Sequence, residues 1–316
     1  MDFRQIQYFL CLYEEGSITR AAHRLNIVQP ALSMQLARLE KEVGQKLFER
    51  NVNGIAPTAA AHFMHGLFLP IMRDIAKAQA LTASLSGKLY GTVEIGMLSS
   101  LASTVLGAAI QSFRSSSPDV EITVKEGYSD VLIESVMSGH LDVALVNRVR
   151  SSSGFHAEPL ISERLCAIVS AGSHTRLKAP VTLRQLADLN LILPTQQNGL
   201  RSLIDRQAQA HGINLQPRIS VDGLLPIIDL VQRTDGVTVL PPLSAYSGLQ
   251  SGALRALPLA KPHVERSLIW VHHSRRPLAP AAQKFIETVN AEIHAAAGRI
   301  RIAGAERASS RRAASV

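Results

Sequence analysis

Apolar side chains recur at three- and four-residue spacing through the first 85 residues, which is the pattern of amphipathic helices. The first helix is predicted to end at Gly16, and the second to run to about Leu25. A third opens at Gln29 and Pro30, where a first-turn proline loses no hydrogen bond, and it stops at Gly44. The pattern therefore predicts three short helices, the last two joined by a three-residue turn.

A small hairpin and one long helix follow. The hairpin is predicted over residues 46–58 with its turn at Asn53, and Thr58 caps a helix that runs to about Ser86. Pro70 lies inside this helix and predicts a kink or a new helix start there. The apolar positions form a heptad, typical of a seam between two helices. They are Met64, Ile71, Ala78 and Leu85 at one position and Ala60, Leu67 and Leu81 at the other.

After a composition break at residues 87–91, short apolar strands alternate with helices. This alternation predicts an α/β domain with parallel sheets, and about 205 residues is enough for two lobes. Strands are predicted over 92–98, 121–128, 142–146, 165–170, 190–194, 218–221, 236–240 and 266–271, with helices starting near Ser99, Ser129, Leu183, Gly199, Leu224 and Pro280. Residues 298–316, with five arginines and no periodicity, are predicted to be a disordered basic tail. Weak attraction of this tail to DNA is the alternative.

Composition narrows the class of protein. Cys11 and Cys166 have no C-x-x-C spacing, which excludes a disulfide scaffold and a cysteine zinc site and fits a reducing cytoplasm. Both are predicted to be core fillers. No apolar run reaches the roughly 18 residues that cross a bilayer, and the N-terminus has no apolar signal core. We expect a soluble cytoplasmic protein with no membrane partner.

Overall charge suggests nucleic acid, but its distribution does not. The formal net charge is +8, yet residues 1–58 hold seven basic and six acidic side chains. The case for DNA therefore rests on geometry. Two helices that cross at a tight turn need small residues there, and Ala21 and Ala22 supply them. The third helix would then enter the major groove, with the hairpin beside it as a wing. The side chains predicted to contact DNA are Gln29, Pro30, Ser33 and Met34 on that helix, and Arg50 and Asn53 in the hairpin. The alternative is a plain helical bundle that packs on the second domain.

A sequence motif makes this geometry specific. It comprises Ser17 to Ala22, Leu25 to Leu36, Leu39-Glu40, Gly44, Leu47 to Arg50, and Gly54 with Thr58. Over residues 2–65 it resembles the winged helix-turn-helix of LysR-type transcriptional regulators. The resemblance implies a DNA-binding domain over 1–58, a dimerising linker helix over 59–90, promoter DNA as partner, and a homotetramer built as a dimer of dimers.

Three positions depart from the family pattern. Val28 stands where serine is frequent, so the third helix loses a side-chain cap. Met34 and Asn53 stand where basic residues are frequent. Less positive charge on the DNA face predicts a shallow salt dependence for each subunit.

Residues 91–297 resemble the family's regulatory domain, a two-lobed fold like that of periplasmic solute-binding proteins. The matching segments are Gly91 with Gly96, Phe113 with Pro118, Gly139 to Ala144, and Gly236 to Pro241. The whole chain is thus expected to be α + α/β, a winged helix-turn-helix with its linker helix followed by this effector domain. The resemblance implies a first lobe of 91–163 and 267–297, a second lobe of 164–266, and a small-molecule effector between them. Leu193-Pro194-Thr195, Gly199-Leu200-Arg201 and a non-serine before Gln29-Pro30 are similar to the nitrogen-assimilation-control branch, which suggests nitrogen or small-acid metabolism.

The residues at the predicted strand ends indicate a ligand site in the same cleft, because ligands of open α/β sheets bind at the carboxyl ends of strands. The side chains expected there are Ser99, Ser100, Tyr128, Asn147, Arg148, Thr195, Gln196, Arg201 and Asp222. Two serines at a helix start and two arginines suit an organic anion, whereas Asp222 would favour an amino or hydroxyl group. The alternatives are ordinary helix caps and solvated arginines.

Enzyme motifs are absent from the sequence: it has no G-x-S-x-G, P-loop, H-E-x-x-H or dinucleotide glycine fingerprint. No cofactor, metal or catalytic residue is expected. His272-His273 is interpreted as a strand end, because no Asp, Glu or Cys is spaced to join it. Two functions remain open beside an effector-controlled regulator: a small-molecule-binding α/β protein with a helical dimerisation segment and no operator specificity, and a chromatin-like binder with little sequence preference.

Overall fold

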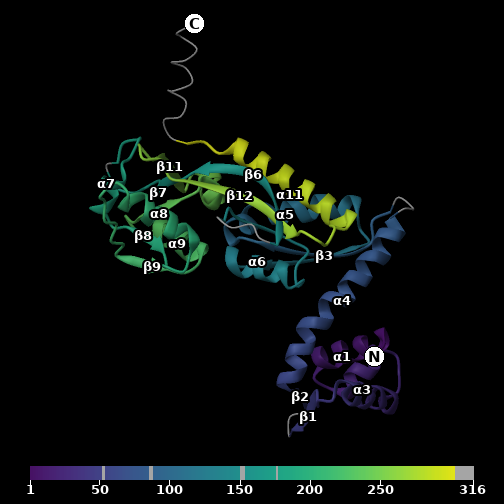
Figure 1. Cartoon of the computed structure of the whole chain (residues 1–316). Helices are drawn as coiled ribbons and strands as arrows, with labels where there is room; N and C mark the ends of the chain where they lie inside the picture. Colours follow the sequence, from purple (N-terminus) through teal and green to yellow (C-terminus); the bar gives the residue numbers. More distant parts are fainter. Residues whose placement is uncertain (52–53, 85–87, 150–153, 176, 303–316) are drawn as a thin grey trace. The chain divides into compact units, whose positions relative to one another are not determined.

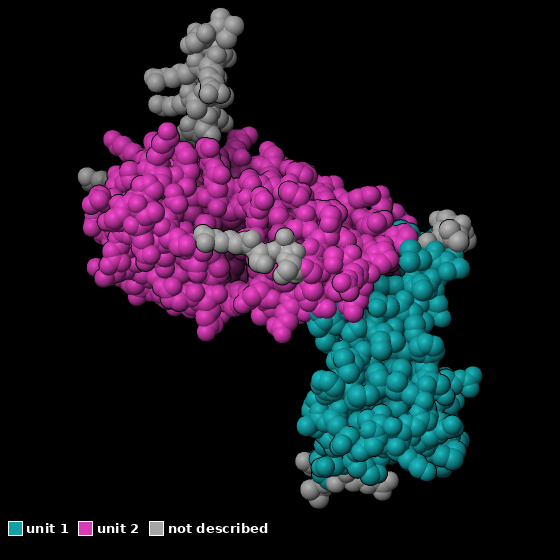
Figure 2. Space-filling view, viewed as in Figure 1, with its two compact units in different colours: residues 1–91, 138–140 teal, residues 92–137, 141–316 magenta. Residues whose placement is uncertain are grey.

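The computed structural model describes residues 1–51, 54–84, 88–149, 154–175 and 177–302. The chain divides into two compact units, coloured separately in Figure 2. Unit 1 comprises Met1–Gly91 with Ser138–His140, and unit 2 comprises the rest.

Unit 1 is helical apart from one hairpin (Figure 1). Its elements are α1 (Phe3–Glu15), α2 (Ile18–Arg24), α3 (Gln29–Val43), β1 (Phe48–Asn51), β2 (Gly54–Pro57) and α4 (Ala59–Ser84). The three predicted short helices, the hairpin and the long helix are all confirmed. They enclose one apolar core in which Phe9, Leu32 and Leu39 are fully buried.

Local signals set the ends of these helices. Asp2 and Gln5 form a capping box at the start of α1. Gly16 and Gly44 end α1 and α3 in the left-handed conformation, at φ of 59° and 73°, which glycine adopts without strain. At the start of α3, Val28 makes no side-chain cap hydrogen bond, as its substitution for serine predicted.

The long helix α4 is continuous through Pro70, so the predicted new helix start is wrong, while a kink there stays a prediction. Thr58 caps the helix as predicted, its hydroxyl accepting from the N–H of Ala61 at 3.2 Å. Three large apolar side chains at four-residue spacing stay exposed: Phe63 by 70%, Leu67 by 49% and Ile71 by 43%. Two of them belong to the predicted heptad seam. We call these three residues the α4 stripe.

Unit 2 contains two β layers. The first has the strand order β4-β3-β5-β12-β6. Its strands are β3 (Gly91–Met97), β4 (Val120–Glu126), β5 (Val143–Asn147), β6 (Phe155–Arg164) and β12 (Glu265–His273). Helices α5 (Ser99–Ser116) and α11 (Pro280–Arg299) pack together through an edge-to-face contact of Phe113 and Phe285. Helix α6 (Ser129–Met137) packs on β5 and β12 (Figure 1).

The second layer has β7 (Cys166–Ser170) between β10 (Val237–Leu240) and β11 (Leu254–Pro258). A bridge from Leu191 to Val237 joins this sheet to the parallel pair β8 (Ile192–Pro194) and β9 (Ile219–Val221). The helices are α7 (Leu183–Ala187), α8 (Gly199–Gln209), α9 (Leu224–Arg233), α10 (Tyr246–Gln250) and a 3₁₀ turn, Pro242–Ala245.

The expectation of parallel sheets is wrong in part. Strand β12 pairs antiparallel with β5 and β6, and β7 pairs antiparallel with β10 and β11. Two of these strands, β6 and β11, were not predicted. Strand β6 alternates exposed and partly buried residues at the edge of its sheet, so it has no continuous apolar run.

The first residues of the predicted tail belong to the folded structure. Helix α11 continues to Arg299, whose carbonyl accepts from the side chain of Gln250 at 2.9 Å, and Ile302 packs on the core of the second layer. The remainder of the predicted tail, 303–316, lies outside the described residues. Among the helices that are described, none is long and apolar enough to cross a membrane.

Both thiols are buried, which confirms their interpretation as core fillers. Burial raises the pKa of the Cys11 thiol and raises that of Cys166 to about 12. The two side chains therefore stay protonated near neutral pH, and a protonated thiol is a poor nucleophile.

Candidate functional site

The face of α3 predicted to meet DNA is exposed in unit 1. Gln29, Pro30 and Met34 are all exposed, and Met34 is 66% exposed although it is apolar. Ser33 is partly buried and lines a hollow of about 150 Å³ that also includes Ile55 of the hairpin. Because the apolar Met34 side chain is exposed to solvent, it is available for contact with thymine methyl groups.

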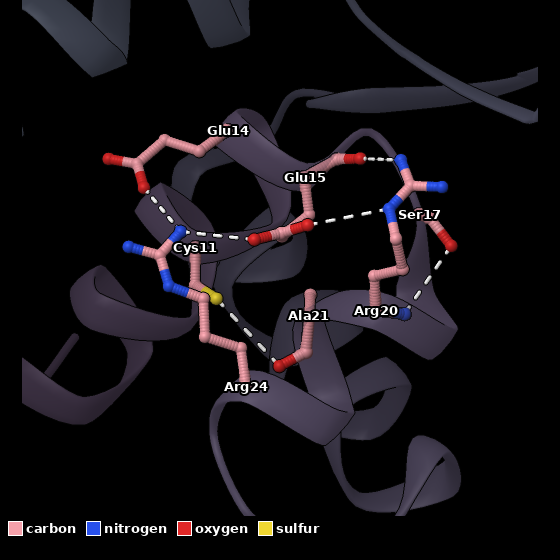
Figure 3. A network of polar contacts seen from close by, with 7 residues as sticks. All are labelled: Cys11, Glu14, Glu15, Ser17, Arg20, Ala21 and Arg24. Carbon is pink, nitrogen blue, oxygen red and sulfur yellow. Dashed lines mark hydrogen bonds and ion pairs between the residues drawn. The ribbon is translucent and has the colours of Figure 1, made fainter.

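A polar network joins α2, the first helix of the helix-turn-helix, to α1 (Figure 3). The Arg24 guanidinium contacts the carboxylates of Glu14 and Glu15 at 2.7 and 3.1 Å, and Arg20 contacts both the carboxylate and the carbonyl of Glu15. The Cys11 thiol points to the carbonyl of Ala21 at 3.7 Å. Ala21 and its neighbour Ala22 are buried, which confirms the small residues predicted at the crossing.

Two further contacts orient the predicted DNA-binding elements. The Gln29 side-chain amide donates to the Thr19 hydroxyl at 2.7 Å, so a residue of α2 positions the first side chain of α3. Glu40 of α3 accepts from the N–H groups of Leu47 and Phe48 and holds Lys46 at 2.7 Å. Burial raises the pKa of the Glu40 carboxyl, but these hydrogen bonds outweigh burial and lower it overall. The ionised carboxylate thus ties the hairpin to α3.

Most of the positive charge in residues 1–58 is already paired. Four of the seven basic side chains there have an acidic partner: Arg20, Arg24, Arg38 and Lys46. The Arg50 side chain is not described, and Asn53 lies outside the described residues. Thr19 and Glu40 belong to the motif that resembles the LysR-type family, although the sequence did not predict either as a residue of the DNA-binding site.

Unit 2 contains a cavity of about 480 Å³. This volume is within the usual range for small-molecule sites. Its walls come from both layers, at the carboxyl ends of β3, β5, β8 and β9. Five of the nine predicted effector residues line it: Ser99, Ser100, Tyr128, Asn147 and Asp222.

Four helices begin at the cavity wall. The lining includes the first residues of α5, α6, α8 and α9. No side chain caps α5 or α9, since Leu98 and Gly223 occupy their N-cap positions. Uncapped first-turn N–H groups and the positive ends of helix dipoles attract anions.

Acidic side chains are also present at the wall. Glu126, Asp130 and Asp222 all line the cavity. The Tyr128 hydroxyl donates to the carboxylate of Asp222, which joins a residue of the first layer to one of the second. The cavity therefore combines a part suited to negative charge with a part suited to hydrogen-bond donors.

A buried ion pair lies beside the cavity, which Arg266 lines. Arg266 of β12 contacts Glu163 of β6 at 2.7 Å, and their side chains are 3% and 8% exposed. Arg266 also donates to the Ser100 hydroxyl at 3.0 Å, and Glu163 accepts from the N–H of Leu243 at 3.3 Å. Each charge thus has an ionic partner and at least one hydrogen bond, although Nη2 of Arg266 meets the Glu163 carboxylate only as an ion pair and makes no hydrogen bond to a described residue.

The other four predicted effector residues do not line this cavity. Arg201 is buried and bonds Asp205 at 2.8 Å and the Pro194 carbonyl at 3.1 Å, and Gln196 also donates to Asp205. Thr195 has a buried hydroxyl with no partner among the described residues. Arg148 is exposed and lines an adjoining cavity of about 550 Å³.

The predicted effector residues did not include several polar residues of the cavity wall, among them Glu126, Asp130, Ser244 and Arg266. The Ser244 hydroxyl is buried without a partner, and so is the side-chain oxygen of Asn147, again counting only described residues. Unpaired buried oxygens next to a cavity suit hydrogen bonds to a ligand or to water. No pattern in the sequence marked Arg266, because its place depends on the pairing of β12 with β6, or Ser244, which lies in the 3₁₀ turn after β10.

Comparison with known proteins was made for both units. The profile of the LysR substrate binding domain matches residues 86–293, and that of the bacterial regulatory helix-turn-helix proteins of the lysR family matches residues 3–62. The nitrogen assimilation regulatory protein nac of Klebsiella aerogenes is 28% identical over 286 residues, which is 90% of this chain and 92% of that protein. The transcriptional dual regulator GltC of Bacillus subtilis is 31% identical over 295 residues, 92% of this chain and 96% of its own length.

Solved structures share the fold at lower identity. A full-length OxyR variant from Pseudomonas aeruginosa has a TM-score of 0.69 at 20% identity, covering 93% of this chain and 95% of its own. Full-length CbnR in complex with its target DNA has a TM-score of 0.68 at 18% identity, covering 92% and 100%. The predicted α + α/β fold class is confirmed.

The buried pair gives a prediction for stability. Replacing Glu163 with Gln leaves the Arg266 charge buried without a counter-charge, so unfolding of unit 2 should become easier by about 3–5 kcal/mol. The exposed neighbouring pair Arg164–Glu265, at 2.8 Å, is a matched control, and Glu265→Gln should cost about 0–1 kcal/mol. Urea unfolding followed by Trp270, the only tryptophan of the chain, reports unit 2 alone. Equal midpoints for the two variants would show that the buried pair has no special role.

Proposed function

Because the chain belongs to the LysR family of DNA-binding transcriptional regulators, we propose that its cavity binds a small carboxylate carrying an amino or hydroxyl group. The protein is a regulator and not an enzyme, with a helix-turn-helix and an effector-binding domain. The family match sets aside the two alternatives that lacked operator specificity or effector control. As a DNA-binding regulator it is proposed to act in the cytoplasm, where the chromosome lies.

The observation that carries the effector proposal is the convergence of four helix N-termini on one cavity. The uncapped start of α5, with Ser99 and Ser100, offers N–H groups and hydroxyls to a carboxylate. The Arg266 charge adds to this positive potential, although Glu163 neutralises much of it. Arg148 and Arg201, the two cations first considered, support the proposal less, since neither lines this cavity.

The acidic part of the cavity supports the second half of the proposal. Asp222, Glu126 and Asp130 would repel a ligand that carried only negative charge. A protonated amine or a hydroxyl of the ligand that faces Asp222 and Tyr128 would instead donate a hydrogen bond to the Asp222 carboxylate. Amino acids and hydroxy acids combine both groups. Two relatives are named for nitrogen assimilation, which agrees with an amino-acid effector and with control of nitrogen or small-acid metabolism.

For the DNA-binding unit, we propose that Gln29, Pro30, Ser33 and Met34 contact the major groove and that Arg50 and Asn53 contact the backbone or minor groove. Exposure of the α3 face and the Gln29–Thr19 hydrogen bond support the major-groove part. With four of seven cations already paired, each subunit gains little from phosphate contacts. Affinity then depends on joining several subunits.

The oligomer we propose is a dimer of dimers, with pairing through α4. The α4 stripe supports it, because three large apolar side chains on one face of a helix are costly to leave in water. A second copy of the same helix would cover them in a two-helix seam. Effector binding would then shift the population between two arrangements of the DNA-binding units.

The effector proposal predicts which ligands stabilise the protein. In a panel of small acids, hydroxy and amino acids should raise the thermal midpoint more than unsubstituted carboxylates of the same size. Ser100→Ala should weaken the affinity about 10- to 100-fold, as loss of a hydrogen bond to a charged group does. Ser103→Ala, on the same helix but outside the cavity lining, is the control and should bind as the unmodified chain does. If no acid shifts either stability or DNA binding, the proposal is wrong.

The DNA proposal predicts a loss of discrimination rather than of binding. Gln29→Ala should weaken binding to a duplex enriched by selection by about 1–3 kcal/mol, while a scrambled duplex is bound as before. Thr19→Val should lose part of this discrimination and Thr19→Ser should keep it, because serine retains the hydroxyl. Gln7→Ala, an exposed glutamine on α1, is the control. Fluorescence anisotropy measures each affinity, and an equal loss on both duplexes would exclude base reading by Gln29.

The oligomer proposal predicts the effect of charge on the α4 stripe. The double variant Leu67→Glu, Ile71→Glu should dissociate the protein at low micromolar concentration. Ala76→Glu, an exposed position on the opposite side of the helix, should leave the assembly intact. Sedimentation velocity measures the mass directly. A double variant with the mass of the unmodified protein would place the contact elsewhere.

A further inference from the structure

Three metal-ligating side chains lie together at one end of the β6–β12 pair in unit 2. His156 and His272 are directly opposite each other in the antiparallel register, and Glu158 is two residues further along β6. All three therefore project from the same face of the sheet. Their ligand atoms lie within 4.8 Å of one another. His272 and His273 do end β12, as the sequence indicated, but the carboxylate that no nearby spacing supplied comes from β6 as Glu158.

The geometry of the cluster suits one ion. Nε2 of His156 lies 3.4 Å from Oε1 of Glu158. Two ligands of a tetrahedral ion with bonds of roughly 2.1 Å are separated by about 3.4 Å. The His156 and His272 rings have centroids 5.1 Å apart at an interplanar angle of 51°, so neither ring stacks flat on the other. Both side chains on β6 are 58% exposed, which leaves them room to turn toward a shared ion.

A backbone contact favours one tautomer of the neutral His272 ring. Its Nδ1 lies 3.3 Å from the carbonyl oxygen of His273, and only a protonated nitrogen can donate to a carbonyl. The proton then resides on Nδ1, and Nε2 keeps its lone pair. Histidine ligands of metals are commonly held in this way by a hydrogen bond from the other ring nitrogen.

We propose that His156, Glu158 and His272 form a binding site for a divalent transition-metal ion of the Zn²⁺ class. Two imidazoles and one carboxylate match the ligands of Zn²⁺, Co²⁺ and Ni²⁺, whereas Mg²⁺ and Ca²⁺ take oxygen ligands. Three protein ligands leave at least one coordination position for water. The site is separate from the effector cavity, since none of its three residues lines that cavity.

A bound ion would act as a cross-strand link. Among the described residues, strand β6 is the edge of its sheet and pairs with β12 alone. These same two strands carry Glu163 and Arg266 at their other end. The ion would thus fasten the end of the pair that the buried salt bridge does not reach, and a metal that binds only the folded state stabilises it.

The test is Zn²⁺ titration of the full-length protein without a polyhistidine tag, by calorimetry, with Co²⁺ absorption as a second measurement. We expect one ion per chain, a tetrahedral-type Co²⁺ spectrum and a rise in thermal midpoint, with no response to Mg²⁺. His156→Ala and His272→Ala should each weaken Zn²⁺ binding at least tenfold. Glu158→Gln should do so without removing the side chain. Circular dichroism checks that the variants fold, which is expected because two of the three residues are exposed.

The controls address other histidines. His62 and His65 of α4 both contact Tyr13 in unit 1 and are another pair of neighbouring histidines, so the double variant His62→Ala, His65→Ala should bind Zn²⁺ as the unmodified chain does. His211→Ala, at the exposed end of α8, is a second control. Absence of saturable Zn²⁺ binding, or binding that survives the loss of both His156 and His272, would overturn the proposal.

Discussion

The effector unit depends on one buried ion pair, between Glu163 and Arg266. The chain passes between the two β layers along β6 and returns along β12, and the pair joins these strands. Its remaining hydrogen-bond capacity reaches the start of α5 through Ser100 and the 3₁₀ turn through Leu243. A buried pair is worth little unless its partners are complete, so the strands, the helix start and the turn must all be in place together. The cavity is the space that this arrangement leaves.

The DNA-binding unit is also held by ion pairs, but these lie at its surface. Its cations are used mainly to hold its own helices, as with Arg20 and Arg24 against α1, rather than being presented to phosphate. Pro30 and Met34 are exposed, and a side-chain hydrogen bond orients Gln29. This face of α3 is therefore better suited to contacts with bases than to contacts with charged phosphates. Such a domain gains affinity by pairing, which agrees with the exposed α4 stripe. Two weakly binding units joined in one assembly can bind DNA with an affinity that exceeds the affinity of either unit alone by a large factor.

Unit 1 was predictable from its sequence because its signals are local. Gly16, Gly44 and Pro30 mark helix ends whatever the rest of the chain does. Much of the cavity was predictable for a topological reason, since strand ends followed by helix starts are where α/β sheets bind ligands. The pairing of Arg201 was also readable from the sequence, because Asp205 is four residues further along the same helix, a spacing that forms ion pairs.

What remained hidden depends on β6. This strand has a polar, alternating pattern at a sheet edge, so it resembled a loop. Because β6 was not predicted, its antiparallel pairing with β12 could not be predicted either. The same holds for the partner of Arg266 and the partners of His272, which lie on β6. Long-range strand pairing is the information that periodicity does not contain.

The most direct test of the account is selection of bound sequences from random duplex DNA by the full-length protein, at moderate salt, with and without the acid that most stabilises it. The account predicts enrichment of an interrupted palindrome, and a change in protection of that site when the acid is added. A folded, oligomeric protein that enriches no sequence in either condition would contradict it.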